Sequence, residues 1–107
     1  MSARIEIVHL SDDTLFDYST RRTGSLRDKT RRILSLKVKY PNKVFSISGP
    51  ADELDPLIPK NSRIILGGGG KESCVKLRHN TLKAEGFDVT IYNCITLNKA
   101  DLFPQSV

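Results

Sequence analysis

The stretch RIILGGGGKESCVKLRHNTLKAEGFDVTIY, residues 63–92, decides the fold class of this chain. Its opening Arg-Ile-Ile-Leu runs directly into four consecutive glycines, which predicts a short buried strand that ends at the glycines. Residues 71–85 follow as a predicted helix, with Gly86 just past its end as a C-terminal cap. Residues 87–92 alternate in polarity and predict another strand. Strand, helix and strand in this order are typical of a parallel sheet.

The alternation of strands and helices extends toward both ends of the chain. Residues 4–10 and 43–48 are predicted as strands. Between them, a helix is expected from Ser25 to Lys37 or Val38, beginning with a capping box whose acid is Asp28. Three segments are predicted to be less regular, namely an irregular stretch with at most one helical turn (14–24), a short helix or turn (51–58) and a surface tail (99–107).

These elements predict one α/β domain over residues 1–107, with a surface tail from about residue 99. Its sheet is mostly parallel, has about four strands and carries helices on its faces, in a Rossmann-like arrangement. In such folds ligands bind beyond the carboxyl ends of the strands, which is where residues 67–73 are expected to lie. A small parallel sheet also has two edges, so self-association is a further possibility.

The composition is that of a soluble globular protein, with 38% hydrophobic and 27% charged residues in 107. No apolar run approaches the roughly 20 residues of a membrane helix, and Arg4 and Glu6 interrupt the N-terminal region where a signal peptide is apolar. Two cysteines, Cys74 and Cys94, are too few for a disulfide scaffold or a zinc site. We therefore expect reduced thiols, a cytoplasmic protein, no metal and no cofactor.

Positive charge is concentrated in one segment of the chain. The 17 basic and 12 acidic residues give a formal net charge of +5. Nine of the basic residues fall between positions 21 and 43, where Asp28 is the single acid. Such a segment attracts nucleic acid, another polyanion or an acidic protein surface, and its alternative is a solvated helix face. The nine residues are Arg21, Arg22, Arg27, Lys29, Arg31, Arg32, Lys37, Lys39 and Lys43.

Aromatic residues accompany the basic segment. Tyr18 and Tyr40 flank it and are the better candidates for stacking on unpaired bases, whereas Phe45 in a strand is more typical of a core. The two histidines, His9 and His79, carry less information. A structural role is the better interpretation of His9, and His79 is five residues past Cys74 and therefore points away from it on a helix.

The glycine run supplies a second candidate site. Gly67, Gly68, Gly69 and Gly70, followed by Lys71, allow a backbone to approach a ligand closely and to aim free amides at a phosphate or carboxylate. The spacing fits neither a Walker phosphate loop nor a dinucleotide fingerprint. A tight strand-to-helix turn packed on the sheet is an equally good interpretation.

Cys74 lies in the predicted first turn of the following helix. Free amides, the helix dipole and Lys71 all favour a thiolate at this position. A nucleophile beside amide donors is the arrangement that acyl transfer needs. The alternative, which bare position favours, is a small residue packing the helix onto the sheet.

Residues 68–75 (GGGKESCV) and 86–89 (GFDV) resemble the nucleophile region of isochorismatase-like cysteine hydrolases, which include nicotinamidases. The family has a glycine six residues before a nucleophilic Cys-Val, then a helix and a Gly-aromatic-x-Val strand. The resemblance covers residues 43–92 and implies that Cys74 is the nucleophile and Lys43 its charged partner. It implies a compact hydrolase of a small amide or ester. The general-base aspartate motif and the metal cluster of nicotinamidases have no counterpart in this chain.

Three functions therefore follow from the sequence. The leading prediction is a small non-catalytic binding or regulatory protein whose basic helix engages nucleic acid or another anionic partner, because the charge asymmetry requires no missing group. The alternatives are a cysteine hydrolase that uses Cys74, and a binder of a nucleotide-sized phosphate ligand at the glycine run.

Overall fold

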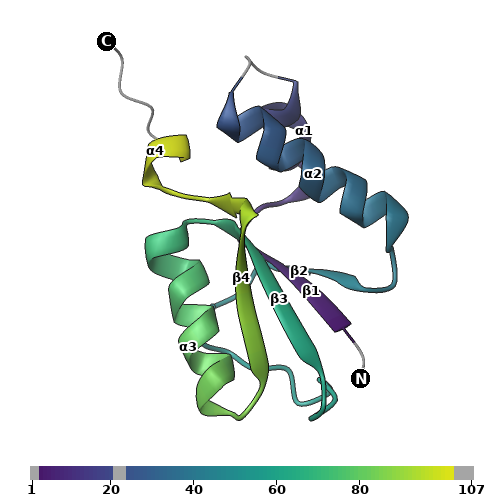
Figure 1. Cartoon of the computed structure of the whole chain (residues 1–107), viewed down its shortest axis with the longest axis vertical. Coiled ribbons are helices and arrows are strands. Elements are labelled where there is room, and N and C mark those ends of the chain that lie inside the picture. Colours follow the sequence, from purple (N-terminus) through teal and green to yellow (C-terminus); the bar gives the residue numbers. More distant parts are fainter. Residues whose placement is uncertain (1–2, 21–23, 103–107) are drawn as a thin grey trace.

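The computed structural model describes residues 3–20 and 24–102 of the chain (Figure 1). Four strands form one sheet: β1 (Ala3–Val8), β2 (Val44–Ile47), β3 (Arg63–Gly69) and β4 (Asp88–Leu97). The helices are α1 (Asp12–Ser19), α2 (Ser25–Lys39), the π-helical turn η1 (Lys71–Val75), α3 (Lys76–Ala84) and α4 (Lys99–Leu102). All neighbouring strands are parallel, in the order β2-β1-β3-β4. The predicted α/β domain with a parallel sheet is confirmed.

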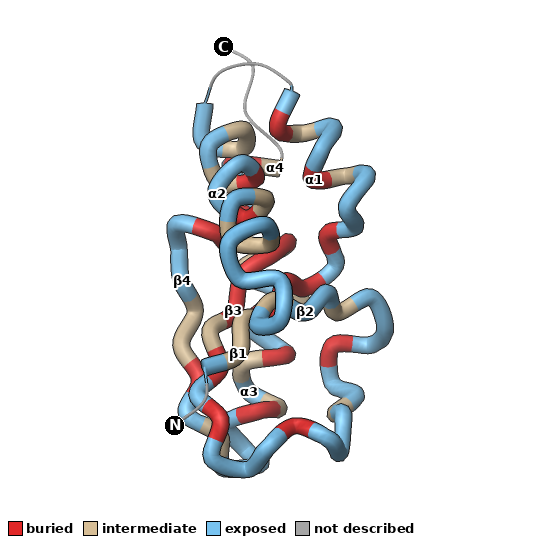
Figure 2. Tube along the Cα trace, turned by 90° about the vertical axis from the view of Figure 1, so that its right-hand side faces the viewer, coloured by how far each residue is buried: buried red, intermediate tan, exposed pale blue. Residues whose placement is uncertain are grey.

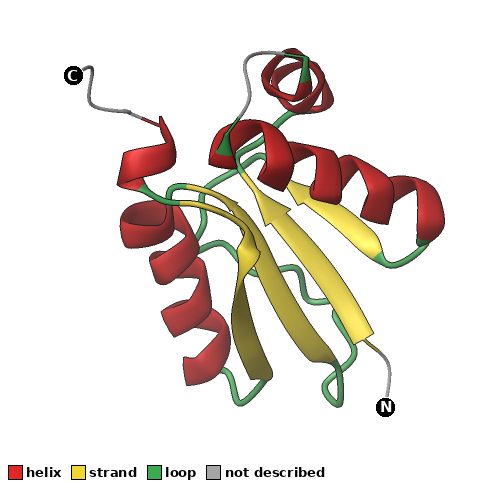
Figure 3. Cartoon of the chain, turned by 45° about the horizontal axis from the view of Figure 1, so that its top comes forward, coloured by secondary structure: helices red, strands yellow, loops and turns green. Residues whose placement is uncertain are grey.

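The sheet lies between two layers of helix, as Figure 3 shows, with α2 on one face and α3 on the other. Side chains of β1 alternate between these faces because successive residues of a strand point in opposite directions. Ile7 packs with Leu15 and Ile33 on the α2 face, whereas Val8 packs with Leu66 and the α3 residue Leu82 on the other. The buried residues follow the strands and the inner sides of the helices (Figure 2).

The chain leaves the two central strands in opposite directions. From β1 it passes through α1 and α2 to β2, and from β3 through η1 and α3 to β4. The carboxyl ends of β1 and β3 therefore form a topological switch point, the usual ligand position in open α/β sheets.

Two predictions near the N-terminus are wrong. Residues 12–19 form helix α1 rather than an irregular stretch, because Ser11 caps it by accepting a hydrogen bond of 3.2 Å from the Thr14 amide. Helix α2 has no capping box, since Gly24 is its N-cap and no side chain caps it. Residues 51–58 form turns, the second of the two alternatives predicted there.

The glycine run continues strand β3 instead of ending it, so the predicted loop at residues 67–70 is reduced to Gly70. The glycines are required by close neighbours. A Cβ at Gly68 would lie 2.3 Å from the Val8 carbonyl oxygen, and one at Gly67 would lie 2.7 Å from Ile95. Their absent side chains let β1 and β4 approach β3 at its carboxyl end.

The end of the described chain is packed and not a surface tail. Strand β4 continues to Leu97 past a bulge, and residues 99–102 form α4, whereas residues 103–107 lie outside the described residues. Asp101 is buried, and Lys29 donates a 2.7 Å hydrogen bond to its carboxylate. Burial raises the pKa of Asp101. Hydrogen bonds with Lys29, Ser25 and the Asn98 backbone lower this pKa by more than burial raises it, so it lies below the ordinary value.

We expect Asp101→Asn to lower the free energy of unfolding at pH 7 by about 1–3 kcal/mol, because a charged hydrogen bond is lost. A lowered folded-state pKa stabilises the fold above the ordinary aspartate pKa of 3.8. The stabilisation disappears as the pH falls through the folded-state pKa. Denaturant unfolding at several pH values measures this, with Asp28→Asn as control because Asp28 is exposed. A difference between wild type and Asp101→Asn that persists in strong acid would contradict the assignment.

Candidate functional site

Helix α2 uses several of its predicted anion-binding residues inside the fold. Lys29 donates to the Thr96 carbonyl oxygen at 2.9 Å as well as to Asp101. Lys37 pairs with Asp12 and donates to the Ser46 hydroxyl at 3.1 Å. Arg27 is half-buried, and its Nη2 lies 3.6 Å from the Asp28 Oδ1. Lys29 and Lys37 therefore attach α2 to neighbouring elements, whereas Arg27 pairs with an acid of α2 itself. All three offer little charge to a partner.

A second group of basic residues faces solvent at the C-terminal half of α2 and the following turn. Arg31, Arg32, Lys39 and Lys43 are exposed. Arg31 donates from Nε to the Ser19 carbonyl oxygen at 3.0 Å, which orients its guanidinium while leaving that group exposed. Within the described chain no carboxylate forms an ion pair with any of the four. Their positive charge is therefore available to an external anion.

Tyr40 lies within this basic group. The residue is 37% exposed, with the Lys39 Nζ 5.4 Å and the Lys43 Nζ 6.0 Å from the ring centroid. The turn is held by the Tyr40 amide, which donates to the Leu36 carbonyl oxygen at 2.8 Å, and by the Lys43 amide, which donates to the Tyr40 carbonyl oxygen at 3.0 Å. We call Arg31, Arg32, Lys39, Tyr40 and Lys43 the α2 basic surface. The predicted residues Arg21 and Arg22 lie outside the described residues.

The structure separates the two residues assigned to a hydrolase. Lys43 lies at the amino end of β2, where its carbonyl oxygen accepts from the Ile5 amide, and Cys74 follows the carboxyl end of β3. Because all strands are parallel, the first position is at the amino ends of the strands and the second is at their carboxyl ends. Lys43 is therefore not placed to act as the charged partner of Cys74.

Cys74 itself is half-buried in the π-helical turn and packs against the core cluster on the α3 face. The amide of Ser73, the residue before Cys74, donates to the Gly70 carbonyl oxygen at 3.1 Å and is therefore not a free donor. These contacts are those of the packing role that position alone favoured. The phosphate role of residues 67–71 stays a prediction, although Gly67, Gly68 and Gly69 are buried in β3.

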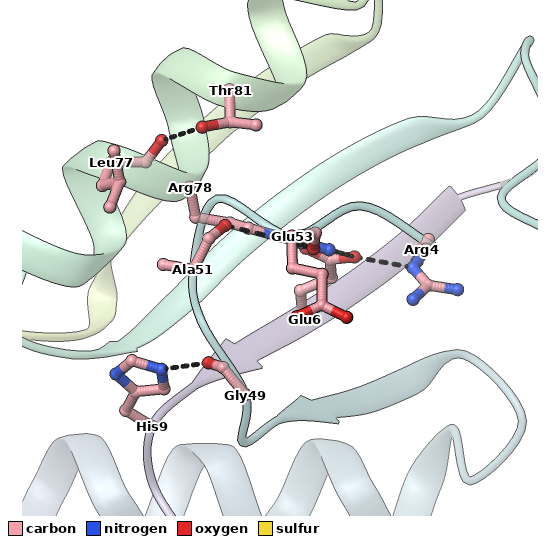
Figure 4. A network of polar contacts seen from close by, with 9 residues as sticks. All are labelled: Arg4, Glu6, His9, Gly49, Ala51, Glu53, Leu77, Arg78 and Thr81. Carbon is pink, nitrogen blue, oxygen red and sulfur yellow. Dashed lines mark hydrogen bonds and ion pairs between the residues drawn. The ribbon is translucent and has the colours of Figure 1, made fainter. Parts of the chain in front are cut away.

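The switch point carries one unusual residue. His9, the residue after β1, has a φ of 54°, a conformation that is rare for residues other than glycine. Its Nε2 lies 2.7 Å from the Gly49 carbonyl oxygen and donates to it (Figure 4). The hydrogen bond joins the end of β1 to the loop after β2 and gives His9 a structural role, as the sequence favoured.

A buried ion pair lies between the sheet and α3, at a position where the sequence predicted no site. Arg78 of α3 forms two hydrogen bonds to Glu6 of β1, Nε to Oε1 at 2.7 Å and Nη2 to Oε2 at 3.0 Å. Its Nη1 also donates to the carbonyl oxygens of Ala51 and Glu53 (Figure 4). The spacing of the residues could have predicted the burial of Arg78. Arg78 is three residues after Val75 and four before Leu82, which places all three on the inner side of the helix. The pair holds the irregular 48–62 segment against the sheet.

Comparisons of this chain with family models, curated proteins and solved structures found no match. The resemblance to cysteine hydrolases therefore stays a prediction from the residues alone. Within residues 3–20 and 24–102, none of the helices has the length and apolar character needed to cross a membrane. The same described residues contain no cluster of three or more His, Cys, Asp or Glu suited to a metal ion.

Proposed function

We propose that this protein is a binding module for single-stranded nucleic acid and that the α2 basic surface contacts the strand. The observation that carries the proposal is the exposed Tyr40, whose ring centroid lies 5.4 Å from the Lys39 Nζ and 6.0 Å from the Lys43 Nζ. It stands at the end of a helix that also exposes Arg31 and Arg32. Cations that follow a phosphate backbone, combined with an aromatic ring for base stacking, are the features of single-strand recognition.

The geometry supports a strand more than a compact anion. Arg32 and Lys39 are seven residues apart on α2, which is two helical turns and about 10 Å along one face. Lys43 extends the positive charge past the end of the helix and beyond Tyr40. The cations are thus spread along a line, and several phosphates are needed to pair with all of them. Pairing releases the counterions condensed on the nucleic acid.

Removing three of these cations tests the proposal. We expect Arg32→Gln/Lys39→Gln/Lys43→Gln to weaken binding of a single-stranded oligonucleotide by at least about 10-fold and to lower the salt slope by up to about 2, since single strands lose about 0.7 per phosphate contact. Fluorescence anisotropy at several salt concentrations measures both. The control is Lys60→Gln/Lys76→Gln/Lys83→Gln, which removes the same charge from exposed lysines outside the α2 basic surface.

Tyr40→Ala separates stacking from charge. It leaves the net charge unchanged and is expected to weaken single-strand binding by about 5- to 100-fold, as loss of one stacked base does. Binding of duplex is expected to change less, because paired bases do not offer their faces. Equal losses in the triple variant and its charge-matched control would reduce the effect to bulk charge. No binding of single-stranded DNA or RNA even at low salt would reject the nucleic-acid function and direct attention to an acidic protein partner.

A further inference from the structure

Helix α2 leaves part of its sheet face uncovered, and a groove lies between them. The groove has a volume of about 660 Å³. Its floor is formed by Ile5, Ile65 and Ile95, and Leu36 of α2 forms part of its wall. Concave apolar sites of roughly 300–1,000 Å³ are the usual size for small ligands.

The bulge in β4 shapes one side of this groove. Pairing of β4 with β3 is regular up to Ile91 and resumes at Thr96, so the intervening residues loop out of the ladder. Ile95 turns inward over Gly67, which has no side chain to block it. Tyr92, 40% exposed, and Cys94 remain at the outer edge of the groove. The groove therefore has an apolar floor and an accessible aromatic side chain at its edge.

Positive charge borders the opposite side. Arg31, Arg32 and Lys39 of α2 line the groove, and no acidic residue does. Arg32 and Lys39 have no ion-pair partner among the described residues. A ligand seated on the isoleucines would thus have its polar end beside two or three cations. This combination selects an apolar body with a negative head group.

We propose that the groove binds a small amphipathic anion, a molecule with an alkyl or aromatic body and one carboxylate, sulfonate or phosphate group. The apolar body lies on Ile5 and Ile65, and the anionic group pairs with Arg32 and Lys39. A nucleic-acid backbone makes no contact with an apolar floor, so the groove ligand is a different molecule from the proposed strand, although both would pair with Arg32 and Lys39. Because the two sites share cations, an occupied groove would compete with a bound strand.

Decanoate is a suitable probe, with decanol as its neutral match. Calorimetry below the micellar concentration is expected to give one decanoate site and weaker binding of decanol. Arg32→Gln/Lys39→Gln is expected to weaken decanoate binding by at least about 10-fold and to leave decanol unchanged, because only the charged contacts are lost. Lys76→Gln/Lys83→Gln on α3 removes the same charge elsewhere and serves as the control.

Alkylation of Cys94 locates the bound ligand. This free thiol is exposed at the edge of the groove, so decanoate is expected to slow its reaction with iodoacetamide, as measured by peptide mass mapping. Absent binding, equal affinity for decanoate and decanol, an equal loss in the control pair, or an unprotected Cys94 would each overturn the proposal. Tyr40 and Lys43 do not line the groove, so Tyr40→Ala, which tests strand binding, is expected to leave decanoate binding intact.

Discussion

Arg78→Met is expected to lower the free energy of unfolding by about 3–5 kcal/mol, the usual cost of removing one partner from a buried ion pair. Arg78 and Glu6 are 1% and 0% exposed. The substitution leaves the Glu6 carboxylate with Arg4 as its remaining ionic partner, at 2.9 Å. It also removes the Nη1 group, which donates to the carbonyl oxygens of both Ala51 and Glu53. Thermal and denaturant unfolding measure the loss, which corresponds to a decrease in Tm of more than about 10 °C.

Two further variants separate the ion pair from general core damage. In Glu6→Leu/Arg78→Met both charges are replaced by apolar side chains, and we expect it to be more stable than Arg78→Met because the fully buried Glu6 carboxylate is no longer left without Arg78. Arg4→Met removes the more accessible partner of Glu6 and is expected to cost about 1 kcal/mol. A double variant no more stable than Arg78→Met would show that the backbone contacts of Arg78, and not its charge, are what the fold requires.

Gly68→Ala is expected to be comparably damaging, at about 3–5 kcal/mol, from two effects that add. Gly68 has a φ of 114°, which L-residues rarely adopt. An added Cβ would also lie 2.3 Å from the carbonyl oxygen and 2.5 Å from the amide nitrogen of Val8. These are backbone atoms of the central strand β1, so relief requires the two strands to separate.

Gly69→Ala is the matched control one residue further along β3. A Cβ there would lie 3.6 Å from the Leu10 side chain, an ordinary contact, so we expect a change within about 1 kcal/mol. Equilibrium unfolding of both variants gives the comparison. Equal stability of the Gly68 and Gly69 variants would contradict the close approach of β1 and β3 and the explanation given for the glycine run.

The fold class was predictable because it depends on local patterns. Alternation in residues 87–92, the apolar run before the glycines and Gly86 after the helix each report on a few neighbouring residues. Helix α1 escaped prediction because its cap, the Ser11 hydroxyl, lies in a group of residues that also suits a turn. The glycines were interpreted as a loop because their neighbours Val8 and Ile95 are distant in the sequence.

The sequence predicted the positive charge of the candidate site but not which residues belong to it. Nine basic residues in one segment concentrate positive charge there whatever the fold. Lys29 and Lys37 were counted with the others because their partners Asp101 and Asp12 come from other elements. Tyr92 was missed because only the sheet brings β4 alongside α2.

The sequence by itself determined the parallel α/β class and the placement of positive charge on α2, since periodicity and charge are properties of consecutive residues. Only the tertiary structure decided which cations remain exposed, that Lys43 and Cys74 lie at opposite ends of the parallel strands, and that Arg78 is buried against Glu6. The physical reason is that ion pairing, burial and close backbone approach depend on distances between residues far apart in the chain. Those distances exist only once the strands have paired.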